Sequence, residues 1–240
     1  MSDVDTIAAH IREIGEKMVA DYQPAPDVVL DKKQGIIPRC LIFEKGGRNP
    51  HGLGTVVVGV NPGNSRVEEQ QFYCARGCSY EGVLAWHFED SEDPHARKRG
   101  KHHPYYRSLT GFLDAVGLDG PILWTELVKC ESKQSTVLSI ETIRKDINCY
   151  LFRELEKIPD DWPLIGVGRQ AYEILAYRFF KRQVIGIPHP TASHGQFAAL
   201  FPSSKAIERN AKEKLADLLR SKDTVAVWFS CSKGKGCRAE

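Results

Sequence analysis

Hydrophobic positions along the chain follow two spacings, one typical of helices and one typical of strands. Apolar residues three or four apart predict amphipathic helices at 5–21, 109–116, 140–155, 170–180 and 204–220. Short apolar runs predict strands at 40–43, 54–60, 122–128, 164–167 and 184–187, with further candidates at 28–30 and 223–229. Alternating strands and helices predict an α/β fold whose parallel sheet is covered on both faces.

Two of the apolar runs end in polar turns. The run at 54–60 leads into Asn-Pro-Gly-Asn-Ser at 61–65, and the run at 184–187 leads into Pro-His-Pro-Thr-Ala-Ser-His-Gly at 188–195. Ligands of open α/β sheets bind beyond the carboxyl ends of the strands. Two polar turns meeting at that edge would form a site.

Length and composition indicate an ordinary globular protein. The 240 residues suit one domain at 1–222, followed by a strand and a basic tail at 223–240. No apolar stretch approaches the roughly 20 residues of a membrane span. The acidic first residues lead into a helix pattern rather than a signal region, and seven cysteines at scattered spacing indicate free thiols. We therefore expect a cytoplasmic monomer without membrane contact, associated with the nucleoid if the source is prokaryotic.

The charged segment at 88–103 interrupts the pattern of helices and strands. Acidic residues at 89–93 precede the basic run Arg-Lys-Arg-Gly-Lys-His-His at 97–103, without periodicity. Such a segment is either a solvated surface loop or an arm that contacts phosphates, since clustered cations gain affinity by releasing counterions from nucleic acid. The net charge of +2 neither requires nor excludes such a partner.

The order of motifs resembles the uracil-DNA glycosylase superfamily from about residue 54 to 197. Gly-Val-Asn-Pro-Gly at 59–63 is similar to its first motif, in the form of the mismatch-specific and single-strand-selective branches. Thr-Glu-Leu-Val-Lys-Cys at 125–130, Cys149 and Gly-Val-Gly-Arg-Gln-Ala at 166–171 resemble the thermophilic iron–sulfur branch, and His-Pro-Thr at 189–191 resembles the second motif. The resemblance implies a three-layer α/β/α sandwich with a central, mainly parallel four-stranded sheet.

The resemblance also implies a role for single residues. Asn61 would position the attacking water, and His189 would stabilise the departing base as an anion, with His194 as an alternate. Phe72, or its neighbour Tyr73, would stack on a base rotated out of the helix. The remaining implied contacts are with the base (Gly59, Val60 and Glu126) and with DNA phosphates (Pro62, Gly63, Asn64, Ser65, Thr191 and Ser193).

Each assignment competes with a structural role. Asn61 could cap the turn before Pro62, as asparagine often does. His189 could be a loop histidine between two prolines, and Phe72 could be an aromatic residue of the core. Exposed backbone amides in tight turns bind phosphate, but the same small residues also serve the turn alone.

Three departures from the superfamily pattern affect the prediction. Glu126 stands where relatives place an Asn that reads the base; it shifts base preference, is protonated through burial, or turns away from the pocket. Ser193 replaces an apolar wedge, with Phe197 as an alternate, which favours single-stranded or distorted DNA. A [4Fe–4S] cluster would need four thiolates, but no Cys-x-x-Cys pair is present, so inert thiols are favoured over the candidate ligands Cys74, Cys78, Cys130 and Cys149.

The sequence thus predicts a monofunctional DNA glycosylase for uracil or another deaminated base, in base excision repair, with no cofactor required for chemistry. Two alternatives remain at this point. One is a catalytically silent, nucleic-acid-binding member of the superfamily. The other is a hydrolase of free nucleosides or nucleotides, for which the basic loop has no function.

Overall fold

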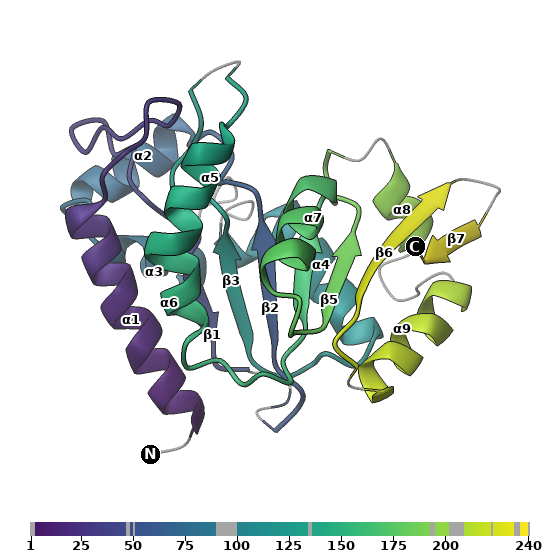
Figure 1. Ribbon diagram of the computed structural model, residues 1–240. Helices are drawn as coiled ribbons and strands as arrows, with labels where there is room; N and C mark the ends of the chain where they lie inside the picture. The colour runs from purple at the N-terminus through teal and green to yellow at the C-terminus, as the bar shows by residue number, and fades with distance from the viewer. Residues whose placement is uncertain are drawn as a thin grey trace. The chain divides into compact units, whose positions relative to one another are not determined.

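The strands of the computed structural model belong to one seven-stranded sheet in the order β1-β3-β2-β4-β5-β6-β7 (Figure 1). The pairs β2–β4, β4–β5 and β5–β6 are parallel, and β6–β7 is antiparallel. The strand bounds are β1 Ile42–Glu44, β2 Thr55–Gly59, β3 Ile122–Glu126, β4 Leu164–Val167, β5 Val184–Ile187, β6 Ala226–Ser232 and β7 Gly236–Ala239. The structure describes residues 3–46, 49, 51–89, 100–133, 136–192, 195–201, 209–221, 223–232 and 236–239.

The α/β class is confirmed, whereas the expected strand number is not. Among the described residues the sheet has seven strands rather than the four that the resemblance implies, and β7 forms outside the predicted apolar runs. β7 lies in the segment interpreted as a basic tail, and its pairing with β6 makes Gly236–Ala239 part of the sheet. The candidate strand at 28–30 forms only an isolated bridge between Val28 and Ser132.

Helices form at the predicted apolar stripes, and further helices form in segments where none was predicted. Their bounds are α1 Asp3–Asp21, α2 Val67–Ala75, α3 Tyr80–Phe88, α4 Pro104–Ala115, α5 Ile140–Asp146, α6 Phe152–Leu155, α7 Arg169–Arg178, α8 Gln196–Leu200 and α9 Arg209–Ser221. The predicted helix 140–155 contains a π-helical turn, Ile147–Leu151, between α5 and α6. Ser139 caps α5, with its hydroxyl oxygen accepting from the Thr142 amide at 3.2 Å.

Contacts within the chain define two compact units, each built from three segments. Unit 1 comprises Met1–Phe43, Gly59–Glu92 and Leu123–Ile158; unit 2 comprises Glu44–Val58, Asp93–Ile122 and Pro159–Glu240.

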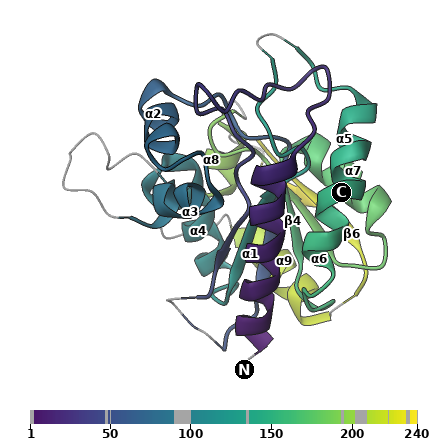
Figure 2. The same ribbon diagram turned by 90° about the vertical axis from the view of Figure 1, so that its left-hand side faces the viewer.

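In unit 1 the amphipathic helix α1 supplies much of the core. Its buried residues repeat at helical spacing, namely Ile7, Ile11, Ile14, Gly15, Met18 and Val19. The helix packs against α3 and α6, and Figure 2 shows it running beside α6. Burial of this stripe is the main source of its stability, as for most surface helices.

In unit 2, α7 packs on β4 and β5 at very short range (Figure 1). A side chain at Gly166 of β4 would come within 2.7 Å of the Tyr172 Cα, so only glycine permits this approach. The register aligns Val58, Gly166 and Gly186 across three neighbouring parallel strands. Unit 2 therefore holds the end of β5, from which the polar turn at 188–195 leaves, whereas the turn at 61–65 belongs to unit 1.

Two further observations concern membrane-spanning helices and the charged segments of the chain. Among the described residues, no helix combines the length and the apolar character needed to cross a membrane. Residues 90–99 of the charged segment 88–103 lie outside the described residues, as do 233–235 of the predicted tail.

Candidate functional site

The Asn-Pro-Gly turn follows β2 directly and is held beside the segment that follows β3. The Leu127 amide donates to the Gly59 carbonyl at 3.0 Å, and the Val128 amide donates to the Val60 carbonyl at 2.9 Å. Pairing thus continues past the strand ends in unit 1. The residues 121–131 are buried without interruption, so this pairing is rigidly supported.

Asn61 is half-buried, and the two ends of its amide differ in environment. Its Nδ2 donates to the Pro62 carbonyl at 3.0 Å. Its Oδ1 has no hydrogen-bond partner among the described residues. The side chain therefore caps its own turn and still presents a fixed acceptor, so the structural and the water-positioning roles are compatible.

Arg39 braces the same turn from the interior of unit 1. Its guanidinium contacts the Gly63 carbonyl, Glu131 at 3.1 Å and Glu69 at 3.2 Å. Burial alone would lower the pKa of this guanidinium, but Glu69, Glu131 and neighbouring groups raise it above its ordinary value. Arg39 stays charged and connects α2, the Asn-Pro-Gly turn and the segment after β3.

This bracing limits which amides of the turn can bind a phosphate. The Ser65 amide donates to Glu131 at 2.6 Å, and the Ser65 hydroxyl accepts from Gln70 at 3.0 Å. Gly63 and Asn64 are exposed. A phosphate would therefore find its backbone donors at 63 and 64 rather than at 65.

Glu126, the last residue of β3, is 7% exposed. Its Oε2 is buried and has no hydrogen-bond partner in the described part of the chain. A methyl group on Gly59 would overlap this carboxyl, so glycine at 59 gives it room. Burial raises the pKa of Glu126 to about 8, although Lys129 and Arg39 act to lower it. The group is therefore mostly a neutral acid at pH 7.

A fully buried ion pair lies behind β3. The Lys129 ammonium contacts the Glu154 carboxylate at 2.9 Å and donates to the Thr125 hydroxyl at 2.7 Å and the Glu126 carbonyl at 2.5 Å. The Thr125 hydroxyl donates to Glu154 at 2.7 Å. Because these contacts use the Lys129 ammonium, it binds the backbone carbonyl of Glu126 and does not pair with the Glu126 carboxyl.

Phe72 lies in an aromatic cluster on α2 and α3. Its ring is 5.1 Å from that of Trp86 and 6.2 Å from that of Tyr73, and the Arg76 guanidinium lies 3.6 Å above its centre. Tyr73 is itself buried and bonded to Glu69 at 3.0 Å. Stacking of a base on Phe72 would therefore require Arg76 to move or the opposite ring face to be used.

His189 follows β5 in unit 2, and its tautomer is fixed by the turn. Its Nδ1 accepts from the amides of Thr191 at 3.2 Å and Ala192 at 3.1 Å. Since a backbone amide only donates, the proton of the neutral ring is on Nε2. Burial lowers the pKa of His189, and the Tyr105 ring lies 5.3 Å away. The Thr191 amide is thus committed to His189 and is not free for a phosphate.

Two residues named from the second motif, Ser193 and His194, lie outside the described residues. Phe197, the alternate wedge, is 5% exposed and packs against Phe112 and Phe201 in unit 2. In this position it serves the core.

The four candidate cluster cysteines differ in environment. Cys130 is buried, Cys74 and Cys149 are exposed, and Cys78 is half-buried. Cys74 and Cys78 interact with each other, and burial, followed by the effect of Cys74, raises the pKa of Cys78. Within the described ranges, no group of three or more His, Cys, Asp or Glu side chains is placed to hold a metal ion.

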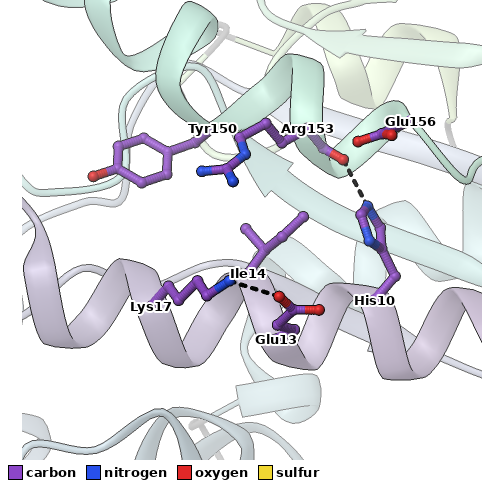
Figure 3. Close-up of a pocket in the computed structure, with 7 residues that line it drawn as sticks. All are labelled: His10, Glu13, Ile14, Lys17, Tyr150, Arg153 and Glu156. Atoms are coloured by element: carbon purple, nitrogen blue, oxygen red, sulfur yellow. Dashed lines mark hydrogen bonds and ion pairs between the residues drawn. The ribbon is translucent and has the colours of Figure 1, made fainter.

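A separate hollow of about 190 Å³ lies between α1 and the helical segment 147–156 in unit 1 (Figure 3). Its charges are largely matched: Lys17 pairs with Glu13 at 2.6 Å, and His10 bonds the Arg153 carbonyl at 2.7 Å. The Arg153 side chain extends above Ile14 toward Tyr150. Its mixed lining does not indicate a ligand class.

Arg39, Glu131 and Glu154 take part in the site but were not predicted from the sequence. Each is a charged residue inside or beside an apolar run, which is a signal for a buried ion pair, but the partners are far apart in sequence.

Comparison with models of known protein families gives no match, and comparison with curated proteins gives none either.

Proposed function

We propose that the protein is a monofunctional DNA glycosylase that hydrolyses the N-glycosidic bond of a deaminated base, with uracil the first candidate. The supporting observation is the buried Oε2 of Glu126, which has no hydrogen-bond partner among the described residues and lies beside Gly59, two residues before Asn61. A polar group left unpaired in a protein interior is costly unless a ligand completes its hydrogen bonds. Glu126 ends β3, and the carboxyl ends of strands are where α/β sheets bind ligands.

The proposed chemistry needs a positioned water and a base that leaves as an anion. Asn61 would hold the water through Oδ1, the acceptor that its own turn leaves open. A cation-like sugar needs only a weak nucleophile, so positioning suffices. For the departing base we assign His189, whose neutral Nε2–H form is the form that can donate a hydrogen bond. No cofactor takes part in these steps.

Asn61 and His189 are assigned to one reaction because the resemblance assigns the two motifs to one reaction. The finer architecture, a three-layer sandwich around the parallel strands, belongs to this proposal. So does the partner, single-stranded or distorted DNA.

One observation favours the silent binding alternative. One face of the Phe72 ring is covered by Arg76, so a base could not stack on that face unless Arg76 moves. A silent member would bind DNA with strong salt dependence and release no base.

Base release from labelled oligonucleotides separates these functions. Substrates carry uracil, hypoxanthine or xanthine, in single and double strands, with free nucleosides in parallel. We expect abasic product from wild type, at least a hundredfold less from an Asn61→Ala/His189→Ala double variant, and unchanged release from Asn148→Ala/His51→Ala, which alters the same residue types at exposed positions. Salt-sensitive binding without product would identify the silent member, and activity on nucleosides alone would identify the small-molecule hydrolase.

A further inference from the structure

In the part of the chain that the structure describes, Oε2 of Glu126 has no hydrogen-bond partner, although two cations are near. Lys129 is bonded to Thr125, Glu154 and the Glu126 backbone carbonyl. Arg39 is engaged by Glu69, Glu131 and the Gly63 carbonyl. Lys129 and Arg39 are the charged groups near Glu126 whose electrostatic effect lowers the pKa of its carboxyl. Both cations therefore act on Glu126 only at longer range.

An unpaired carboxyl group in this environment is more stable when protonated. A buried carboxylate without hydrogen bonds pays a desolvation cost that protonation removes. The neutral acid has one O–H donor and one carbonyl acceptor, the same pair of functions that a side-chain amide has, whereas the ionised form only accepts. Protonation thus changes what the residue can recognise.

We propose that Glu126 reads its base as a neutral acid, accepting from the ring N–H and donating to the adjacent C=O of a lactam edge. Uracil, hypoxanthine and xanthine carry this edge. Ionisation removes the donor and sets a negative oxygen against the base carbonyl, so recognition is lost as the pH rises. This inference rests on the proposed function and specifies its substrate class, with Glu126 as a specificity-determining residue.

Two readouts test the inference independently of turnover. The first is the protonation state of Glu126, followed by 13C NMR of its carboxyl carbon and assigned with Glu126→Gln. The second is the affinity for a single-stranded oligonucleotide with one 2′-fluorinated deoxyuridine, whose fluorine opposes the cation-like sugar and prevents cleavage. The same oligonucleotide with a tetrahydrofuran abasic analogue at that position corrects for phosphate binding.

We expect a neutral carboxyl at pH 7 and a uracil-specific affinity about tenfold lower at pH 9 than at pH 6.5, since only the neutral fraction binds. Glu126→Gln supplies donor and acceptor at every pH, so its uracil-specific affinity should not change. An ionised carboxyl at pH 7, absence of uracil-specific binding, or the same pH dependence in Glu126→Gln would overturn the inference. Absence of base release from ordinary deoxyuridine, with pH-dependent binding intact, would instead refute the proposed chemistry alone.

Discussion

At the scale of residues, the candidate site depends on the absence of a side chain at Gly59. The glycine lies at the end of β2, and its Cα faces the carboxyl of Glu126. The sequence predicted that both residues line a base, but it left three states open for Glu126. Burial and the engagement of Lys129 and Arg39 by other groups favour the protonated state. The carboxylates that pair with these cations, Glu154 with Lys129 and Glu69 and Glu131 with Arg39, are 25 or more residues away in sequence, so no local pattern could have shown this pairing.

Gly59→Ala should destabilise the protein by about 1–3 kcal/mol, because the new methyl group must displace the Glu126 carboxyl in a packed interior. Urea unfolding measures the change. In a Glu126→Ala background the same substitution should cost much less, since the overlap is gone. Gly63→Ala is the matched control for stability, because nothing lies within 4 Å of its added methyl group. Equal costs in both backgrounds would show that the two residues are not in contact.

The pH dependence of stability gives a second test of Glu126. Its pKa is about 8 in the folded protein against an ordinary value of 4.5, so the folded state retains a proton that the unfolded chain releases. The contribution of Glu126 to the unfolding free energy is therefore full below pH 4.5 and falls as the pH rises through 8. The slope approaches about 1.4 kcal/mol per pH unit within this window.

Chemical unfolding of wild type and Glu126→Gln from pH 5 to 9 measures this contribution as a difference. The difference should shift in favour of the variant as the pH rises. A constant difference would mean that the carboxyl titrates near its ordinary pKa.

At the scale of elements, the sequence predicted the helices and strands that have a clear apolar pattern. Helix α1 and strands β2, β4 and β5 lie within about a residue or two of their predicted bounds. Helix α2 was missed because it buries only Tyr73 and has no apolar stripe. The π-helical turn at 147–151 was also missed, since one apolar stripe runs through both α5 and α6.

The buried pair of Lys129 and Glu154 connects the segment after β3 to α6. Lys129→Met should cost about 3–5 kcal/mol, because it leaves the Glu154 carboxylate buried without its cation. The double variant Lys129→Met/Glu154→Met should recover most of that loss, since no unpaired charge remains. A double-mutant cycle in urea measures the coupling. Additive losses would contradict the assignment of a direct ion pair.

At the scale of the whole molecule, the alternation of strands and helices predicted the α/β class, and apolar runs predicted strands at the places of β1 to β6. Strand β7 lies in the segment interpreted as a basic tail, and the count of four strands came from the resemblance. Of the candidate site, the sequence identified the residues at the strand ends. It did not identify Arg39, whose contacts join residues 39, 63, 69 and 131.

The account joins a glycosylase reaction to a neutral Glu126, and one measurement tests both. This measurement is the rate of uracil release from a single-stranded oligonucleotide between pH 6.5 and 9, for wild type and Glu126→Gln. We expect release by both proteins, with the ratio of the wild-type rate to the Glu126→Gln rate falling as the pH rises through about 8. Ionisation of uracil itself affects both proteins equally and cancels in this ratio. No release by wild type, or parallel profiles for the two proteins, would contradict the account.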